Sequence, residues 1–481
     1  MNYESLKAKK VFEFFEQICN IPHGSGDEEG LSIFLEDFAK QRGLKVKRDE
    51  VNNVIITKEA TSGYEDRKTV IVQSHIDMVC EKNKDSNHNF LTDPIRLIWE
   101  DDFLRADGTT LGADDGIGVA FALALLDSNE IDHPRLEALF TVDEERGLAG
   151  AKHIKREDLS GEYLINIDSE EEGIFVVGCA GGIRINTHIK AEISSFSDNA
   201  YKCFSLDLTG LMGGHSGTDI SKERLNAIIL LVRCLNELKK ELDIKLCSID
   251  GGSKDNAIPR ECSAVVFINN NDLEKAEKII NANLDCFIKE ASDEDKNVRL
   301  SLNEAEAEGV ISSADLDKLL ALVLNLPNGV QSSNVELGLP ESSANVGVIE
   351  TKENTIRVAC LARSSLISKK YYLLERVNSL AGIIGAEVTT EGDYPAWEYK
   401  TDSVLRDRFV EVYLKEFEVE PLVEVIHAGL ECGIFAKSLE GMDMISFGPN
   451  VYDAHTPQER VSISSVERMW SFFKNVIISL D

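Results

Sequence analysis

The sequence predicts an α/β protein in which both ends of the chain form one α/β layer and an α+β unit is inserted between them. Short apolar runs typical of buried strands alternate with helical patterns up to about residue 185. From about residue 187 strands alternate with long amphipathic helices, a combination typical of an α+β unit. His455, which also follows an expected strand, lies near the end of the chain. We therefore expect residues 1–186 and 398–481 to form one domain and residues 187–397 to form the inserted domain.

The individual elements follow from hydrophobic periodicity. In the first domain helices are expected near residues 4–19, 28–42 and 116–128, and strands near 52–58, 68–74, 139–142, 163–167 and 442–447. In the inserted domain strands are expected at 200–209 and 264–268, and helices at 221–242 and 272–290.

Composition excludes several classes of function. The chain has 481 residues and a formal net charge of −33, which argues against nucleic-acid binding and against binding to an anionic membrane. The first 18 residues form an amphipathic pattern without the apolar core of a signal peptide. No stretch approaches the roughly 18–20 apolar residues of a membrane span. The ten cysteines form no CxxC pair and are typical of reduced thiols, so we expect a cytoplasmic protein.

Five short segments carry carboxylates or histidines, and most of them directly follow an apolar run. In open α/β sheets ligands bind at the carboxyl ends of parallel strands, so four of the five segments are expected at one edge of a single sheet. Each segment alone has an ordinary explanation, such as a helix cap or a solvated turn. Together they would crowd carboxylates that repel one another, and a cation is the usual compensation. The segments are His75–Asp77, Gly112–Gly116, Asp143–Glu145, Asn166–Asp168 and Asp453–His455.

In this order the segments resemble the co-catalytic metallopeptidase family that contains aminoacylases, tripeptidase T, glutamate carboxypeptidases and carnosine-type dipeptidases. The motifs SHIDMV, LGADDG, TVDEERG, HAGLECG and YDAHTPQER carry the resemblance, which runs nearly end to end. It implies a phosphorylase/hydrolase-like catalytic domain with an inserted α+β lid domain. It also implies metal-dependent hydrolysis of dipeptides, including Xaa-His peptides such as β-alanyl-histidine. A tripeptidase, an N-acyl amino acid deacylase and a catalytically inactive peptide-binding relative remain alternatives.

The resemblance also implies a two-metal site. His75 and Asp168 would bind one ion, Glu145 and His455 the other, and Asp114 would bridge them. Nitrogen and carboxylate ligands without sulfur suit two zinc ions, with cobalt or manganese as substitutes.

Two further carboxylates complete the implied catalytic set. Asp77 would hold the other imidazole nitrogen of His75, and Glu144 would be the general base. Relatives often carry Gly-Arg-Gly before the bridging aspartate, which this chain lacks, so Asp115 stays open as an alternative bridge. A cis peptide bond is expected between Asp114 and Asp115.

Substrate contacts are expected from the inserted domain and from the HAGLECG segment. In the Gly213–Gly217 segment (GGHSG), His215 is either an exposed turn residue or, by resemblance, a donor to the oxyanion. Asn256 and Arg363 resemble residues that bind the terminal carboxylate of a substrate, and the arginine fork matches a carboxylate. Gly429 would let the backbone approach substrate. His427 could be a spare metal ligand, but a supporting or structural role is favoured. The expected partners are small peptides, and the chain is expected to be a monomer or a homodimer.

Overall fold

The computed structural model describes residues 6–335 and 338–481 and divides the chain into two compact units. Unit 1 comprises Met1–Cys179, Trp397–Val425 and Leu430–Asp481. Unit 2 comprises Ala180–Ala396 and Ile426–Gly429. Among the described residues, no helix combines the length and the apolar character that crossing a membrane requires.

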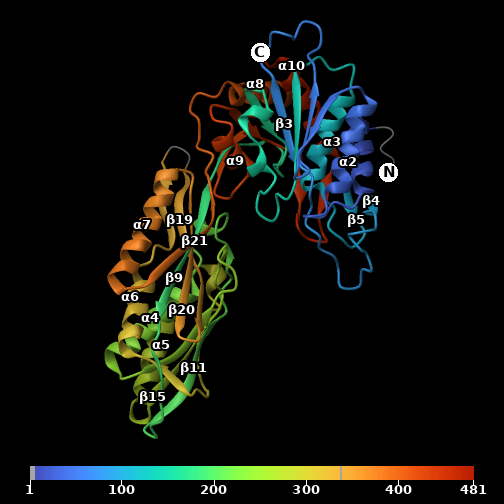
Figure 1. Cartoon of the computed structure of the whole chain (residues 1–481). Helices are drawn as coiled ribbons and strands as arrows, with labels where there is room; N and C mark the ends of the chain where they lie inside the picture. Colours follow the sequence, from blue (N-terminus) through green and yellow to red (C-terminus); the bar gives the residue numbers. More distant parts are fainter. Residues whose placement is uncertain (1–5, 336–337) are drawn as a thin grey trace. The chain divides into compact units, whose positions relative to one another are not determined.

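An eight-stranded sheet forms the centre of unit 1, with the order β1-β2-β6-β3-β7-β23-β8-β22. Its four middle strands, β6, β3, β7 and β23, are parallel to their neighbours in this group. Every residue of β3 and of β6 is buried, as expected for parallel strands with both faces covered. Figure 1 shows β3 in the middle of this unit, with helices to both sides. The strands are β1 (Lys45–Arg48), β2 (Val54–Lys58), β3 (Val70–His75), β6 (Leu136–Thr141), β7 (Tyr163–Asn166), β8 (Ile174–Cys179), β22 (Leu422–Ile426) and β23 (Asp443–Ser446).

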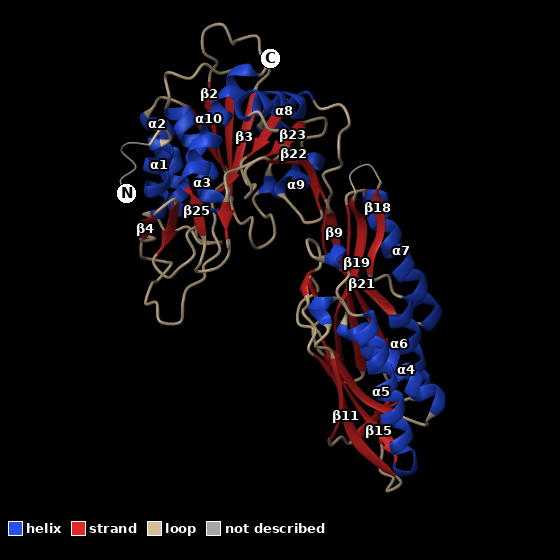
Figure 2. Ribbon diagram, turned by 180° about the vertical axis from the view of Figure 1, so that it is seen from behind, coloured by secondary structure: helices blue, strands red, loops and turns tan. Residues whose placement is uncertain are grey.

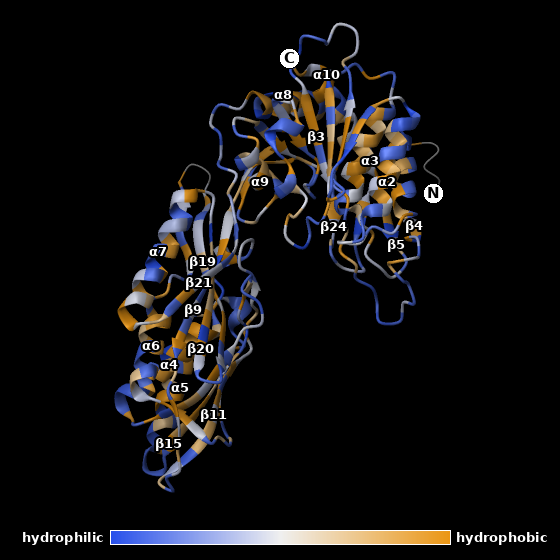
Figure 3. Ribbon diagram, in the orientation of Figure 1, coloured by the Kyte–Doolittle hydropathy of each residue, from blue (hydrophilic) through white to orange (hydrophobic). Residues whose placement is uncertain are grey.

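Helix α3 (Ala113–Asp127) packs on β3 and is apolar on nearly all sides, which is typical of a buried helix. Figure 3 shows the hydrophobic colouring of α3 and β3. Gly118 permits the close approach, because a Cβ there would lie 2.4 Å from the carbonyl oxygen of Ile167 and 2.7 Å from Oγ of Ser74. The start of α3 is therefore fixed against the ends of two strands. The other helices of unit 1 are α1 (Lys9–Cys19), α2 (Glu29–Gln41), α8 (Val404–Phe417), α9 (Glu431–Ser438) and α10 (Ile463–Ser479).

A small four-stranded sheet of unit 1 positions the last candidate segment. Its strands are β4 (Leu97–Glu100), β5 (Phe103–Ala106), β24 (Val451–Tyr452) and β25 (Arg460–Ser462). The loop between β24 and β25 carries His455. Because β24 pairs with β25 and β25 pairs with β5, both ends of this loop are held in a sheet.

Unit 2 is an antiparallel sheet with helices on one face, as Figure 2 shows. The strand order is β16-β11-β15-β13-β19-β20-β9-β21, and β18 pairs with β19. A continuous apolar core that includes Leu206, Leu235, Val266 and Phe287 fills the space between sheet and helices. The helices are α4 (Ala227–Glu241), α5 (Leu273–Glu290), α6 (Ser313–Asn325) and α7 (Ile367–Ile384). The strands are β9 (Gly181–Lys190), β11 (Tyr201–Thr209), β13 (Lys245–Gly251), β15 (Cys262–Asn269), β16 (Arg299–Glu304), β18 (Gly329–Asn334), β19 (Leu339–Lys352), β20 (Thr355–Ser364) and β21 (Glu387–Tyr394).

The predicted α/β fold is confirmed, and the expected buried strands of unit 1 correspond to β2, β3, β6, β7 and β23. The sequence predicts the first helix from residue 4; residues 4–5 lie outside the described part, and α1 begins at Lys9. Unit 2 begins at Ala180, a few residues before the expected position, because β9 is one continuous strand. The segment Ile426–Gly429 belongs to unit 2, although the sequence predicts it in the other domain.

Candidate metal centre

The five proposed ligands all lie in unit 1, at the ends of elements. His75 is the last residue of β3, and Asp114 lies at the start of α3, where its backbone (φ −84°, ψ 106°) is not helical. Glu145 and Asp168 follow β6 and β7, and His455 lies between β24 and β25. The strand ends thus bring together groups that are far apart in sequence.

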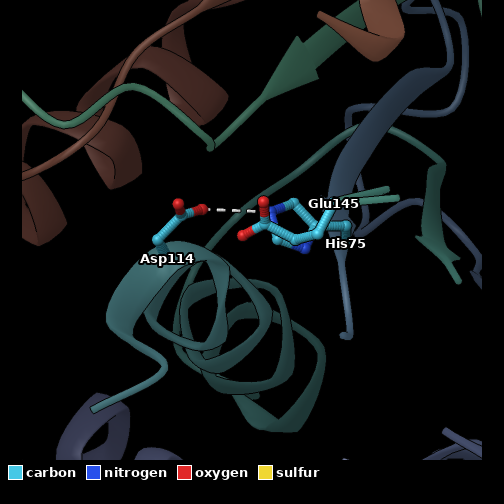
Figure 4. Close-up of side chains that lie close together, drawn as sticks. All are labelled: His75, Asp114 and Glu145. Carbon is cyan, nitrogen blue, oxygen red and sulfur yellow. Dashed lines mark hydrogen bonds and ion pairs between the residues drawn. The ribbon is translucent and has the colours of Figure 1, made fainter. Parts of the chain in front are cut away.

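Asp114 occupies the middle of this cluster. Its Oδ1 lies 3.0 Å from Nε2 of His75, and its Oδ2 lies 3.0 Å from Nε2 of His455. Figure 4 shows the side chains of Asp114, His75 and Glu145 close together. Each histidine contacts one more carboxylate: Nε2 of His75 lies 3.4 Å from Asp168 Oδ1, and Nε2 of His455 lies 2.8 Å from Glu145 Oε1. One carboxylate therefore joins two histidine–carboxylate pairs.

The electrostatics of the cluster favour positive charge. Hydrogen bonds to Asp114 and Glu145 raise the pKa of His455 to about 11. Burial opposes protonation of His75, but Asp168 and Asp114 outweigh it and raise its pKa well above the usual value. Burial also raises the pKa of Asp168 to about 6, although His75 opposes this. A cation among these carboxylates would supply the same compensation, so the donor set fits divalent metal ions.

The two adjacent aspartates are placed differently. The peptide bond between Asp114 and Asp115 is cis, as expected from the sequence. Asp115 is buried, and its Oδ2 accepts the backbone N–H of His75 at 3.2 Å. Ligand atoms of Asp115, His75 and Asp168 lie within 4.8 Å of one another, which is close enough for the three to hold a metal ion. Asp114 is the aspartate whose two oxygens reach both histidines.

Asp77 connects His75 to the loop after β6. Nδ1 of His75 lies 3.0 Å from the backbone carbonyl of Asp77 and 3.5 Å from its Oδ1, so the nearer contact is the carbonyl. The Asp77 carboxylate accepts the backbone N–H of Glu144 at 2.9 Å and that of Glu145 at 3.3 Å. Despite burial, the hydrogen bond with His75 lowers the pKa of Asp77 to about 2.

The surroundings of Glu144 strengthen its carboxylate as a proton acceptor. Burial, together with the charges of Asp168, Glu431 and Glu145, raises its pKa well above the usual value, although His75 opposes the shift. A general base is most effective when its pKa lies near the working pH.

Two buried carboxylates near the cluster have no assignment from the sequence. Glu431, the first residue of α9, accepts hydrogen bonds from Nε2 of Gln73 at 2.6 Å and Oγ1 of Thr141 at 2.7 Å. Glu459 accepts backbone N–H groups of the turn before Asp114. Both lie in motifs that carry the family resemblance, HAGLECG and YDAHTPQER, which is the signal that could have pointed to them.

The other four candidates lie in unit 2. His215, on β12 (Gly214–His215), pairs with Ala257 of β14 (Ala257–Ile258). Its Nδ1 accepts the backbone N–H of Thr218 at 3.2 Å, which leaves the proton of the neutral ring on Nε2. Burial and the charge of Arg363 lower the pKa of His215, which favours this neutral form. His215 can therefore donate a hydrogen bond through Nε2.

Arg363, on β20, is 5% exposed, and its Nη1 donates to Oη of Tyr394 at 2.7 Å. Its Nε has no hydrogen-bond partner among the described residues. Gly429 lies against the same tyrosine, because a Cβ there would be 2.9 Å from Cε2 of the ring. Nε2 of His427 lies 2.7 Å from Oγ of Ser343.

Asn256 is the remaining substrate-binding candidate of unit 2. It lines a pocket of about 400 Å³ in unit 2, together with Arg184, Asp255 and Arg357. Its backbone carbonyl accepts the N–H of Ser216, which ties it to the segment of His215.

Comparison with known proteins places the chain in a family. Residues 71–479 match peptidase family M20/M25/M40, so the chain belongs to this family and is a peptide hydrolase. This confirms the family expected from the motifs.

Two relatives are similar over nearly the whole length. The cytosol non-specific dipeptidase of Escherichia coli (strain K12) is 38% identical over 474 residues, which are 98% of each chain. The crystal structure of aminoacylhistidine dipeptidase from Vibrio alginolyticus has a TM-score of 0.93 and 38% identity, covering 100% of this chain and 98% of that one. Aminopeptidase PepT from Bacillus cereus shares the fold, with a TM-score of 0.58, 16% identity and 99% of both chains covered.

Proposed function

We propose that this protein is a cytoplasmic dipeptidase that uses two divalent metal ions, zinc in the first instance, to hydrolyse unblocked dipeptides, including Xaa-His peptides. The observation that carries the two-ion proposal is the position of Asp114, whose two oxygens each face a different histidine. The preference for dipeptides is supported by the similarity to two proteins that are named as dipeptidases and match over nearly their whole length.

In the proposed reaction His75, Asp168, Glu145 and His455 would hold the ions, and Asp114 would contribute to both. The ions would activate a water molecule and polarise the scissile carbonyl. The carboxylate of Glu144 takes the proton of the attacking water and then delivers it to the nitrogen of the leaving amine. The raised pKa of Glu144 supports the first of these steps, because it makes the carboxylate a stronger base.

Residues of unit 2 are proposed to bind the substrate. His215 donates from Nε2 to the oxygen that becomes negative during attack, because its Nδ1 is already occupied as an acceptor. Nε of the buried Arg363, which lacks a partner among the described residues, is proposed to contact the terminal carboxylate of the substrate, with Asn256 and the backbone at Gly429 as further contacts.

A panel of blocked and extended peptides tests this function. We expect kcat/KM for Ala-His or Gly-Leu to exceed that for the N-acetylated, C-amidated or one-residue-longer forms by orders of magnitude, because a site built around charged ends leaves buried groups unpaired with the wrong substrate. Equal activity on the acetylated peptide would instead indicate a deacylase, and equal activity on the longer peptide a tripeptidase.

A matched variant locates the carboxylate contact. Arg363→Lys keeps the positive charge but loses the planar fork, so KM for free dipeptides should rise while the weak activity on amidated peptides changes little. An equal loss on both substrates would contradict the assignment of Arg363.

A further inference from the structure

Glu459 binds the turn that presents Asp114. It lies in the loop between β24 and β25, it is 2% exposed, and its carboxylate faces four successive backbone N–H groups. Oε2 accepts from Leu111 at 2.7 Å and from Gly112 at 3.1 Å. Oε1 accepts from Ala113 at 2.7 Å and from Asp114 at 3.4 Å.

We propose that Glu459 is a positioning residue of the metal centre: it does not bind metal itself, but it fixes the backbone of Asp114 so that both oxygens of this carboxylate are available to two ions. The inference rests on the proposed two-metal function. It assigns a role to a residue that the chemical mechanism does not use.

The turn itself explains why an anchor is needed. Gly112 has a positive φ of 71°, and the backbone of Asp114 is not helical. The N–H groups of this turn therefore point toward one common position instead of following a helix axis. Converging N–H groups form a cradle for an anion. A buried N–H without a partner costs free energy comparable to a lost hydrogen bond. The carboxylate of Glu459 satisfies these groups and thereby selects this conformation of the turn.

Glu459 also lies in the same loop as His455, a second proposed ligand. It follows His455 by four residues in the same loop, and Nε2 of His455 contacts the carboxylate of Asp114 directly. The next residue, Arg460, pairs with Arg105 in the small sheet, which fixes where Glu459 can reach. The segment from His455 to Glu459 therefore contacts both the side chain and the backbone of Asp114.

The chemistry requires a carboxylate of this length. In Glu459→Gln one oxygen can still accept, but the amide NH₂ faces N–H donors and can accept nothing from them. In Glu459→Asp the charge remains, but the side chain is one methylene shorter. Both changes leave the five proposed ligands untouched. Glu459→Gln also removes a negative charge beside Asp114, whereas Glu459→Asp keeps it, so the comparison of the two variants separates charge from placement.

The chain offers a matched control in Glu137. This residue of β6 is 3% exposed, and its carboxylate accepts the backbone N–H groups of Ser160 at 2.8 Å and of Gly161 at 3.0 Å. It is thus a buried, backbone-binding glutamate of the same unit, near the start of β6, whereas Glu145 follows the end of that strand. Glu137→Gln should lower stability without changing metal binding.

The test is a zinc titration of the purified full-length chain in competition with a chromophoric chelator. For Glu459→Gln we expect affinity for both ions to fall about 10–100-fold, a typical effect of losing a group that orients a ligand. Glu137→Gln should bind zinc as the wild type does, and Glu459→Asp should recover part of the affinity. Circular dichroism without metal shows that each variant is folded.

The outcomes separate the inference from the function on which it rests. Wild-type zinc affinity in folded Glu459→Gln would overturn the positioning role and leave the proposed function standing. If Glu459→Gln does not fold, the same titration of Glu459→Asp decides. Failure of both variants to fold would overturn the inference, because Glu459 would then support unit 1 as a whole. A wild-type chain that binds no zinc, cobalt or manganese would overturn the proposed function itself.

Discussion

The backbone N–H of Glu144 donates a hydrogen bond of 2.9 Å to Oδ1 of Asp77. The carbonyl of Asp77 in turn lies 3.0 Å from Nδ1 of His75. One residue therefore orients both a proposed metal ligand and the proposed general base. If Glu144 acts as a base and not as a ligand, removing its charge should leave the metal centre intact.

We predict that Glu144→Gln retains both metal ions and loses several orders of magnitude in kcat, because an amide cannot accept the proton of the attacking water. Metal analysis and steady-state kinetics on the same preparation measure both quantities. The neighbouring Asp143→Asn serves as the control, since Asp143 pairs with Arg146 at 2.5 Å and has no proposed part in the chemistry. Near-normal turnover of Glu144→Gln would remove this residue from the mechanism.

His215→Ala should retain metal but turn over about 10²–10³-fold more slowly, the usual effect of losing a donor to the oxyanion. His215→Gln should recover part of the rate, because its amide N–H can still donate. Loss of metal from His215→Ala, measured by elemental analysis, would show that this histidine is a ligand and not a donor to the oxyanion.

The buried His427 predicts a pH dependence of stability that is independent of metal. Burial and the nearby Arg363 lower its pKa from 6.5 to about 4. Between pH 6.5 and 4 the unfolded chain binds a proton at this histidine that the folded chain excludes. The stability that His427 contributes is therefore fully present above pH 6.5, and the free energy of unfolding decreases as the pH falls toward 4. The full effect is on the order of 3 kcal/mol.

Urea unfolding at several pH values between 7.5 and 4.5 measures this effect. His427→Gln cannot titrate, so its midpoint should fall less than that of the wild type over this range. Parallel curves for the two proteins would contradict the assigned shift. The comparison between variants also removes the contributions of all other groups that titrate in this window.

The sequence predicts the sheet of unit 1 well, for a physical reason. Parallel strands that are buried on both faces are continuous apolar runs, as in β3 and β6, and a polar group directly after such a run must lie at the carboxyl edge of the sheet. The sequence alone therefore predicts that His75, Glu145 and Asp168 lie close together. The segment of His455 also follows an expected strand, at residues 442–447, whereas Asp114 follows no such strand and its inclusion depends on family resemblance.

Other features have no local sequence signal. Glu459 binds backbone N–H groups about 345 residues upstream, and side chains that bind a distant backbone leave no periodic pattern. The start of unit 2 differs from the prediction for another reason. The boundary expected near residue 187 falls within β9, which begins at Gly181, where a Cβ would be 2.6 Å from the backbone nitrogen of Ala396. Close packing requires this glycine, and it gives no signal in the sequence that a strand continues across the expected boundary.

The central claim is that Asp114 is shared by two ions, and the metal content of Asp114→Asn tests it most directly. The substitution removes the charge that both ions share, so elemental analysis after zinc reconstitution should find neither position filled. Asp115→Asn, the adjacent isosteric change, should keep two ions per chain under the same conditions. Two zinc ions retained in Asp114→Asn would contradict the account, most decisively if Asp115→Asn had lost both.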